Sequence, residues 1–179
     1  PSYVYLVIGF FTCGFQLAFI TTHYPTYLKD LNMQAWVAGS ALALIGLFNI
    51  VGSLGAGWLS ARMSKRWLLV WIYFARGAAV VLLFVFPPST GLALVFAALM
   101  GLLWLSTVPP TSGLVALMFG TRYMAMLYGF VFFSHQVGGF LGAWLGGVMY
   151  ERTGSYEIMW YLSILFCIGS GLINIPIKE

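Results

Sequence analysis

Two side chains within long apolar stretches of this sequence are able to carry a positive charge. Arg76 and His135 each lie well inside a stretch without other charges. A cation in an apolar environment is costly and needs a partner, so Arg76 indicates anion binding or gating, or a structural arginine bonded to backbone carbonyls. Histidine changes its charge near neutral pH and can carry a proton or meet a carboxylate. The alternative for His135 is a neutral ring bonded to a neighbouring helix.

Three uncharged side chains in similar stretches are candidates to shape the same site. They are Gln16, Asn49 and Trp104. The two amides are expected to bind substrate, or else to bond between helices at about 0.6 kcal/mol each. The aromatic ring is expected to wall a cavity. No catalytic or metal-binding pattern accompanies these residues, because the two histidines lie far apart in the sequence and the two cysteines do not form a C-x-x-C pair. We therefore expect no enzyme activity, metal or cofactor.

The elements that must position these residues follow from the composition. Hydrophobic residues make up 61% of the 179 residues and charged residues only 7%, whereas a soluble domain carries roughly 25% charge. The eight Lys and Arg are too scattered for a nucleic-acid interface. The charge-free stretches are continuous and long enough to cross a lipid bilayer as helices, without the alternation of a barrel. The sequence predicts an all-α integral membrane protein with spans at about 3–22, 36–59, 67–86, 91–111, 123–150 and 157–175.

The ends and the orientation of these spans follow from prolines and basic residues. Pro25 is expected to end the first span, and Pro87-Pro88 separates the third from the fourth. Pro109-Pro110 is expected to bend or end the fourth span, because proline lacks an N–H donor. Basic residues gather in the loops after the second and fourth spans and in the C-terminal tail. Since positive loops stay in the cytoplasm, both termini are predicted to be cytoplasmic, in an inner (plasma) membrane. Because Pro1 is not an initiator, we expect the chain to be part of a longer polypeptide.

The two halves of the sequence resemble each other at an offset of 86 residues. Gly52 then falls on Gly138, and Asn49 falls on His135. The match predicts two three-helix units of opposite topology, an inverted repeat of the kind that transporters use. The alternative is chance similarity between two glycine-rich helices.

Glycine recurs every four residues in the fifth span, at Gly138, Gly142 and Gly146. Small residues at this spacing let membrane helices approach closely. The spacing therefore predicts a packing surface, which is also compatible with a surface that slides during transport.

The loop between the second and third spans carries a motif that resembles one in the major facilitator superfamily. Residues 57–66 read GWLSARMSKR, and the family pattern is G-x-L-x-D-R-x-G-R-R, with Ala61 here in the place of the Asp. The resemblance implies the C-terminal six-helix half of a twelve-helix transporter, completed by an N-terminal half or by a second copy of the chain. It also implies an anchoring and gating role for the motif, although the missing Asp weakens the charge relay. The matched motif residues are Gly57, Arg62, Lys65 and Arg66.

Within that superfamily the sequence is similar to oxalate–formate exchangers and monocarboxylate porters. The segment from Asn49 to Gly57 resembles their N-x-x-G-R-x-x-x-G, with Ser53 in place of the Arg, and His135 stands where the exchangers carry a Lys. The segment around Trp104 resembles one with a cavity-lining Trp. The resemblance implies secondary active transport of a small, monocarboxylate-like organic anion by alternating access, with proton coupling through His135 as a further hypothesis. The alternatives are drug or amphipath efflux by the same fold, and a membrane assembly module that transports nothing.

Overall fold

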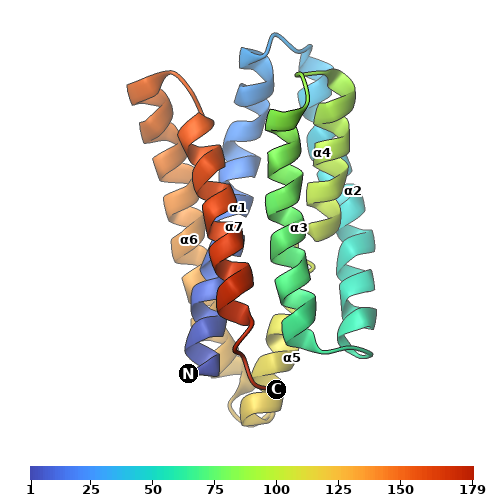
Figure 1. Cartoon of the computed structure of the whole chain (residues 1–179), viewed down its shortest axis with the longest axis vertical. Helices are drawn as coiled ribbons and strands as arrows, with labels where there is room; N and C mark the ends of the chain where they lie inside the picture. The colour runs from blue at the N-terminus through green and yellow to red at the C-terminus, as the bar shows by residue number, and fades with distance from the viewer.

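A computed structural model describes residues 1–179 as a bundle of α-helices without strands. Six helical segments are long and apolar enough to cross a membrane, and α4 and α5 together form one of them. Figure 1 shows the helices running roughly parallel to one long axis, with both chain ends at the same end of the bundle. The helices are α1 (Ser2–Asp30), α2 (Ala35–Ser60), α3 (Lys65–Val85), α4 (Thr90–Leu103), α5 (Val108–Phe119), α6 (Met124–Thr153) and α7 (Glu157–Asn174).

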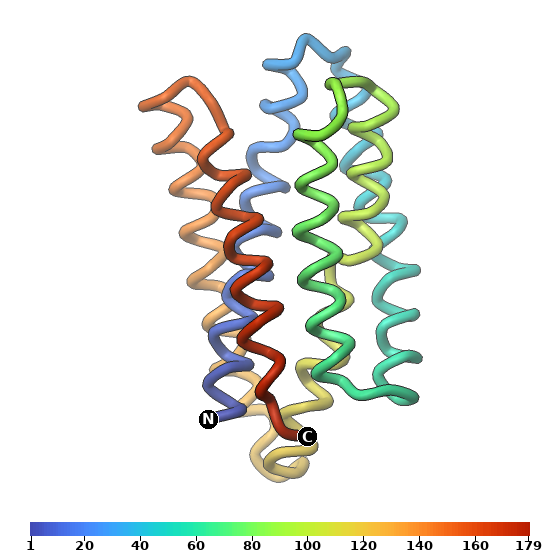
Figure 2. The backbone as a smooth tube through the Cα atoms, in the orientation of Figure 1, coloured from blue at the N-terminus to red at the C-terminus, as the bar shows by residue number.

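The helices pack in three main pairs, each of which joins the first half of the chain to the second. α1 packs against α6, α2 against α4, and α3 against α7. The tube in Figure 2 shows the resulting arrangement, with α1, α6 and α7 on one side and α2, α3 and α4 on the other. If the first, second and third spans exchanged places with the fourth, fifth and sixth, the same three pairs would result. The inverted repeat stays a prediction with which the pairing is compatible.

Glycines allow the closest of these pairs to meet backbone to backbone. A Cβ atom on Gly138 would overlap the carbonyl of Phe11 in α1, and one on Gly52 would overlap the carbonyl of Leu102 in α4. Gly142 likewise faces the carbonyl of Phe15. Any larger side chain at these positions would push the helices apart, so both crossings depend on glycine.

Two helix boundaries differ from those expected from proline. α1 runs through Pro25 and ends at Asp30, and this extension of about two turns beyond the expected span places Tyr24 and Leu28 in the core. The fourth span is interrupted after Leu103, several residues before Pro109 and Pro110. These two prolines occupy the first turn of α5 instead of ending a helix. Proline is tolerated in a first turn because the N–H that it lacks would have no partner within the helix.

Two clusters of buried apolar side chains lie at different levels of the bundle. Trp160 of α7 packs edge-on against Phe19 and Phe96 in the larger cluster, and Tyr73 and Phe10 belong to the smaller one. α2 and α6 are the least buried of the spanning segments. Arg76 of α3 and Asn49 of α2 meet at the interruption of the fourth span, where Trp104 belongs to the larger cluster.

Candidate functional site

Arg76 is completely buried and bonds to the backbone where α4 ends. Its side chain is 0% exposed, its Nε donates to the carbonyl of Leu103 at 3.1 Å, and its Nη2 donates to the carbonyl of Trp104. The last carbonyls of a helix have no partner within the helix and carry a partial negative charge. They therefore balance the guanidinium where no carboxylate does. The third nitrogen, Nη1, is buried without a partner.

Asn49 bonds to the same interruption from α2. Its Oδ1 accepts from the backbone N–H of Leu105 at 3.1 Å and from the hydroxyl of Ser53 at 3.2 Å. Arg76 and Asn49 thus hold consecutive residues of the chain from two different helices. Backbone groups that a break releases inside a membrane need partners of this kind.

Trp104 lies at the start of the interruption, is 8% exposed and belongs to the larger apolar cluster. Its carbonyl is shared, because the thiol of Cys13 approaches it at 3.9 Å while Arg76 donates to it. The same sulfur lies 3.3 Å from the hydroxyl of Thr107. The sequence reading passed over Cys13, although its spacing of three residues from Gln16 places both on one face of a helix.

Gln16 lies one turn further along α1 and is also 0% exposed. Its Oε1 accepts from the thiol of Cys167 in α7 at 3.6 Å, whereas its Nε2 has no partner. Gln16 therefore presents an unused donor in the interior, as Arg76 does.

His135 lies on the other side of Cys13, where α6 crosses α1. Its ring is 5.1 Å from that of Phe10 and stacks on Phe132 at 5.2 Å between centroids. The side chain is 9% exposed, and neither ring nitrogen has a hydrogen-bond partner. The backbone of His135 is held by Gly14, since a Cβ there would overlap the His135 carbonyl. The ring is thus fixed by aromatic packing, and both of its nitrogens are buried without a hydrogen-bond partner.

The structure therefore brings three of the five candidate residues together at the break, namely Arg76, Asn49 and Trp104. Gln16 and His135 lie to either side, along the face of α1 that carries Cys13. The glycines of α6 face α1: Gly138 and Gly142 meet its backbone, and Gly146 lies under the ring of His23.

The basic loop motif lies at the end of the bundle that holds both termini. Arg62 places its guanidinium 3.8 Å from the ring centroid of Trp58, and the side chain of Lys65 lies against Gly113 of α5. The Arg66 N–H donates to the Glu179 carboxylate at 2.6 Å, and the Arg66 Nη1 donates to the Ile177 carbonyl at 3.0 Å. A carboxylate is stabilised at the start of α3 because the free N–H groups of a helix N-terminus attract negative charge.

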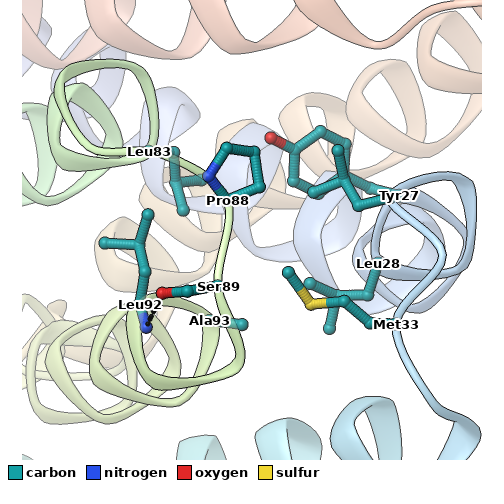
Figure 3. Close-up of a pocket in the computed structure, with 9 residues that line it drawn as sticks. Tyr27, Leu28, Met33, Leu83, Pro88, Ser89, Leu92 and Ala93 are labelled. Atoms are coloured by element: carbon teal, nitrogen blue, oxygen red, sulfur yellow. Dashed lines mark hydrogen bonds between the residues drawn. The ribbon is translucent and has the colours of Figure 1, made fainter.

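Two cavities differ in their relation to these residues. Figure 3 shows an apolar notch near the opposite end of the bundle, between Tyr27, Leu83, Pro88 and their neighbours, which contains none of the candidate residues. A groove of about 280 Å³ instead lies beside the interruption, with Leu102, Leu103 and Ser106 on its wall. None of the five candidate residues lines this groove, which reaches the break only through Leu102, Leu103 and Ser106.

Comparison with known proteins identifies the fold. Residues 6–177 match the model of the Major Facilitator Superfamily. The chain belongs to this superfamily. It is 30% identical over 177 residues, or 95% of the chain, to the uncharacterized MFS-type transporter YcxA of Bacillus subtilis. It is 29% identical to monocarboxylate transporter 13 of Rattus norvegicus over 86% of the chain, and 26% identical to monocarboxylate transporter 12-B of Danio rerio over 97%.

The chain spans about two fifths of the length of these relatives, 42% for YcxA and 37% for the other two. The resemblance to a major facilitator half is thus confirmed, and so is the all-α membrane fold. Membership in this superfamily and the six apolar helices identify a multi-pass membrane protein.

Proposed function

We propose that the chain is the six-helix half of a secondary transporter that moves a small organic anion of the monocarboxylate class by alternating access. The observation that carries the proposal is an excess of buried hydrogen-bond donors without any buried acid. Gln16 Nε2 and Arg76 Nη1 are donors without partners, and His135 has two unpaired ring nitrogens. The four acidic residues, Asp30, Glu151, Glu157 and Glu179, are all exposed at helix ends or in the tail.

A negatively charged substrate fits such an interior better than a cation does. The guanidinium of Arg76 raises the electrostatic potential over several ångströms, because an interior with few polar groups screens charge poorly. The carboxylate of a substrate supplies an acceptor for the unpaired donors of Gln16 and His135, while Arg76 contributes through its charge and not through direct contact. The names of two relatives, monocarboxylate transporters 13 and 12-B, agree with this class of substrate.

His135 is the residue that we propose contacts the substrate carboxylate. Its ring is oriented by Phe10 and Phe132 but makes no hydrogen bond, so a bound carboxylate would not have to displace one. A proton on the imidazole would strengthen the contact, which makes proton-coupled uptake the associated mechanism. In the proposed arrangement α1, α2, α4 and α6 line the route, the termini and the motif of Gly57 and Arg62 face the cytoplasm of an inner membrane, and a second six-helix half or a second copy completes the site.

Uptake of labelled lactate and pyruvate into proteoliposomes tests this function. The protein should accumulate label, and His135→Ala should lower uptake at least about tenfold and flatten its dependence on pH, as loss of a charge-assisted contact does. Phe133→Ala is the matched control, because Phe133 is on the same helix and 67% exposed.

Two results would reject parts of the proposal. Unchanged pH-dependent uptake in a well-folded His135→Ala protein would remove the histidine from the site. Export of amphipathic drugs without any monocarboxylate uptake would instead assign the fold to efflux.

A further inference from the structure

The interruption between α4 and α5 is the one place in the fourth spanning segment where the helix stops inside the bundle. We propose that Arg76 and Asn49 are positioning residues that hold this interruption, and that Arg76 exchanges backbone carbonyl partners there when the transporter changes between its two open states. The inference rests on the proposed transport function and gives Arg76 and Asn49 a role other than direct contact with substrate.

The first step of the argument concerns the charge of Arg76. A cation buried at 0% exposure normally requires an anion, yet all acidic residues of the chain are exposed. The available negative charge is the C-terminal end of α4, whose Leu103 and Trp104 carbonyls accept from Arg76. Arg76 and the end of α4 therefore stabilise each other. The partial negative charge of the terminal carbonyls balances the guanidinium, and the guanidinium donates the hydrogen bonds that these carbonyls lack within the helix.

The second step concerns the opposite side of the break. Asn49 accepts from the N–H of Leu105, the residue that follows the two carbonyls held by Arg76. Pro109 and Pro110 begin α5 and bring no N–H group of their own, which reduces the number of donors that need partners. The hydroxyl of Ser106 donates back to the carbonyl of Leu102. The carbonyls of Leu102, Leu103 and Trp104 and the N–H of Leu105 thus have partners of the correct kind from α2, α3 and the break itself.

The third step concerns the freedom of the break to move. The groove of about 280 Å³ beside it leaves space next to Leu102, Leu103 and Ser106. Arg76 keeps one donor, Nη1, without a partner. A guanidinium presents several donors in a fixed fork, so Arg76 can bond a new carbonyl before it releases an old one. During a small shift of the break, the guanidinium of Arg76 therefore always keeps at least one backbone carbonyl as a hydrogen-bond acceptor.

Cys13 supplies a reporter of the break that needs no substrate. Its thiol is 0% exposed and lies against Thr107 and the Trp104 carbonyl. The experiment measures the rate at which N-ethylmaleimide modifies Cys13 in the full protein, read by mass spectrometry of the peptide that contains it. Arg76→Lys and Asn49→Ala should each speed modification about tenfold, since each removes one hydrogen bond to the break. Arg122→Lys, in an exposed loop, is the matched control and should leave the rate unchanged.

Uptake kinetics distinguish positioning from substrate contact. For Arg76→Lys we expect the maximal rate of labelled lactate uptake to fall about tenfold while KM stays within about twofold, because binding is intact and the conformational change is slowed.

A raised KM with an unchanged maximal rate would overturn the proposal and place Arg76 on the substrate. Cys13 modification within twofold of the unmodified protein in both variants, in samples that elute as one folded species, would overturn it as well. Absence of lactate uptake by the unmodified protein would refute the proposed function alone, since the modification rates still decide whether the two residues hold the break.

Discussion

Asn49 and His135 occupy matching positions in the two halves of the sequence, 86 residues apart, yet their surroundings differ completely. Each belongs to a helix that a glycine three residues later brings against a neighbour, Gly52 against α4 and Gly138 against α1. The side-chain oxygen of Asn49 accepts hydrogen bonds from the backbone N–H of Leu105 and the hydroxyl of Ser53. His135 lies between two phenylalanines with both ring nitrogens unpaired.

The difference shows how one packing arrangement supports two roles. Where the facing helix is interrupted, the polar residue at this position completes the backbone hydrogen bonds. Where the facing helix is continuous, as α1 is, no backbone group is available and the polar residue is left free. An unpaired buried polar side chain reduces stability and is expected mainly where binding or chemistry needs it.

The largest expected effect comes from breaking the two glycine crossings on which the comparison depends. Gly52→Val and Gly138→Val should each lower the thermal midpoint of the purified protein by roughly 10 °C, because each new side chain collides with the backbone of the facing helix. Gly55→Val is the matched control, since no atom lies within 4 Å of a Cβ added there. Equal losses in all three variants would mean that helix propensity and not close approach decides stability at these positions.

A smaller effect of opposite sign should separate the two polar residues themselves. Asn49→Leu should lower the free energy of unfolding by about 1–2 kcal/mol, since it leaves the Leu105 N–H unpaired. His135→Leu removes two unpaired polar atoms and should leave stability unchanged or raise it by about 0.5 kcal/mol, while it abolishes the proposed substrate contact. Thermal unfolding in detergent measures both variants, and a His135→Leu protein as unstable as Asn49→Leu would contradict the comparison.

The smallest effect is expected for Ser53, whose hydroxyl donates to the same Asn49 oxygen that the Leu105 N–H uses. Ser53→Ala should cost no more than about 0.6 kcal/mol, the usual value of a side-chain hydrogen bond in a membrane bundle. If thermal unfolding showed a loss as large as that of Asn49→Leu, the orientation of Asn49 would depend on Ser53 and the two residues would act as one unit.

The sequence predicted the spanning helices and the family better than it predicted the site. Charged residues are rare within the hydrocarbon of a bilayer, so the positions of the charges located the six spanning segments. The motif in the loop around Arg62 indicated the superfamily. The place of the break was missed because Pro109 and Pro110 are equally compatible with ending one helix and beginning another.

Backbone carbonyls were one of the two kinds of partner expected for Arg76, but the particular groups that Arg76 and Asn49 bond could not be predicted, for a different physical reason. Both bond to backbone groups, which every residue possesses, so no residue type along the sequence marks the partner. Only the packing of α2 and α3 against the fourth span decides which carbonyls and N–H groups are free. The contacts of His135 were equally inaccessible, because they depend on where α6 crosses α1. Its role in binding stays a prediction.

The interrupted fourth span also constrains how the protein is assembled in the membrane. α4 has 14 residues and α5 has 12, so at about 1.5 Å per residue neither reaches across some 30 Å of hydrocarbon alone. The pair must enter the bilayer as one unit with its exposed backbone groups already matched. Cys13, Asn49 and Arg76 all precede the break in the chain, and are therefore synthesised before the residues they hold. The partners that Arg76 and Asn49 provide for the broken span thus already exist when that span is made.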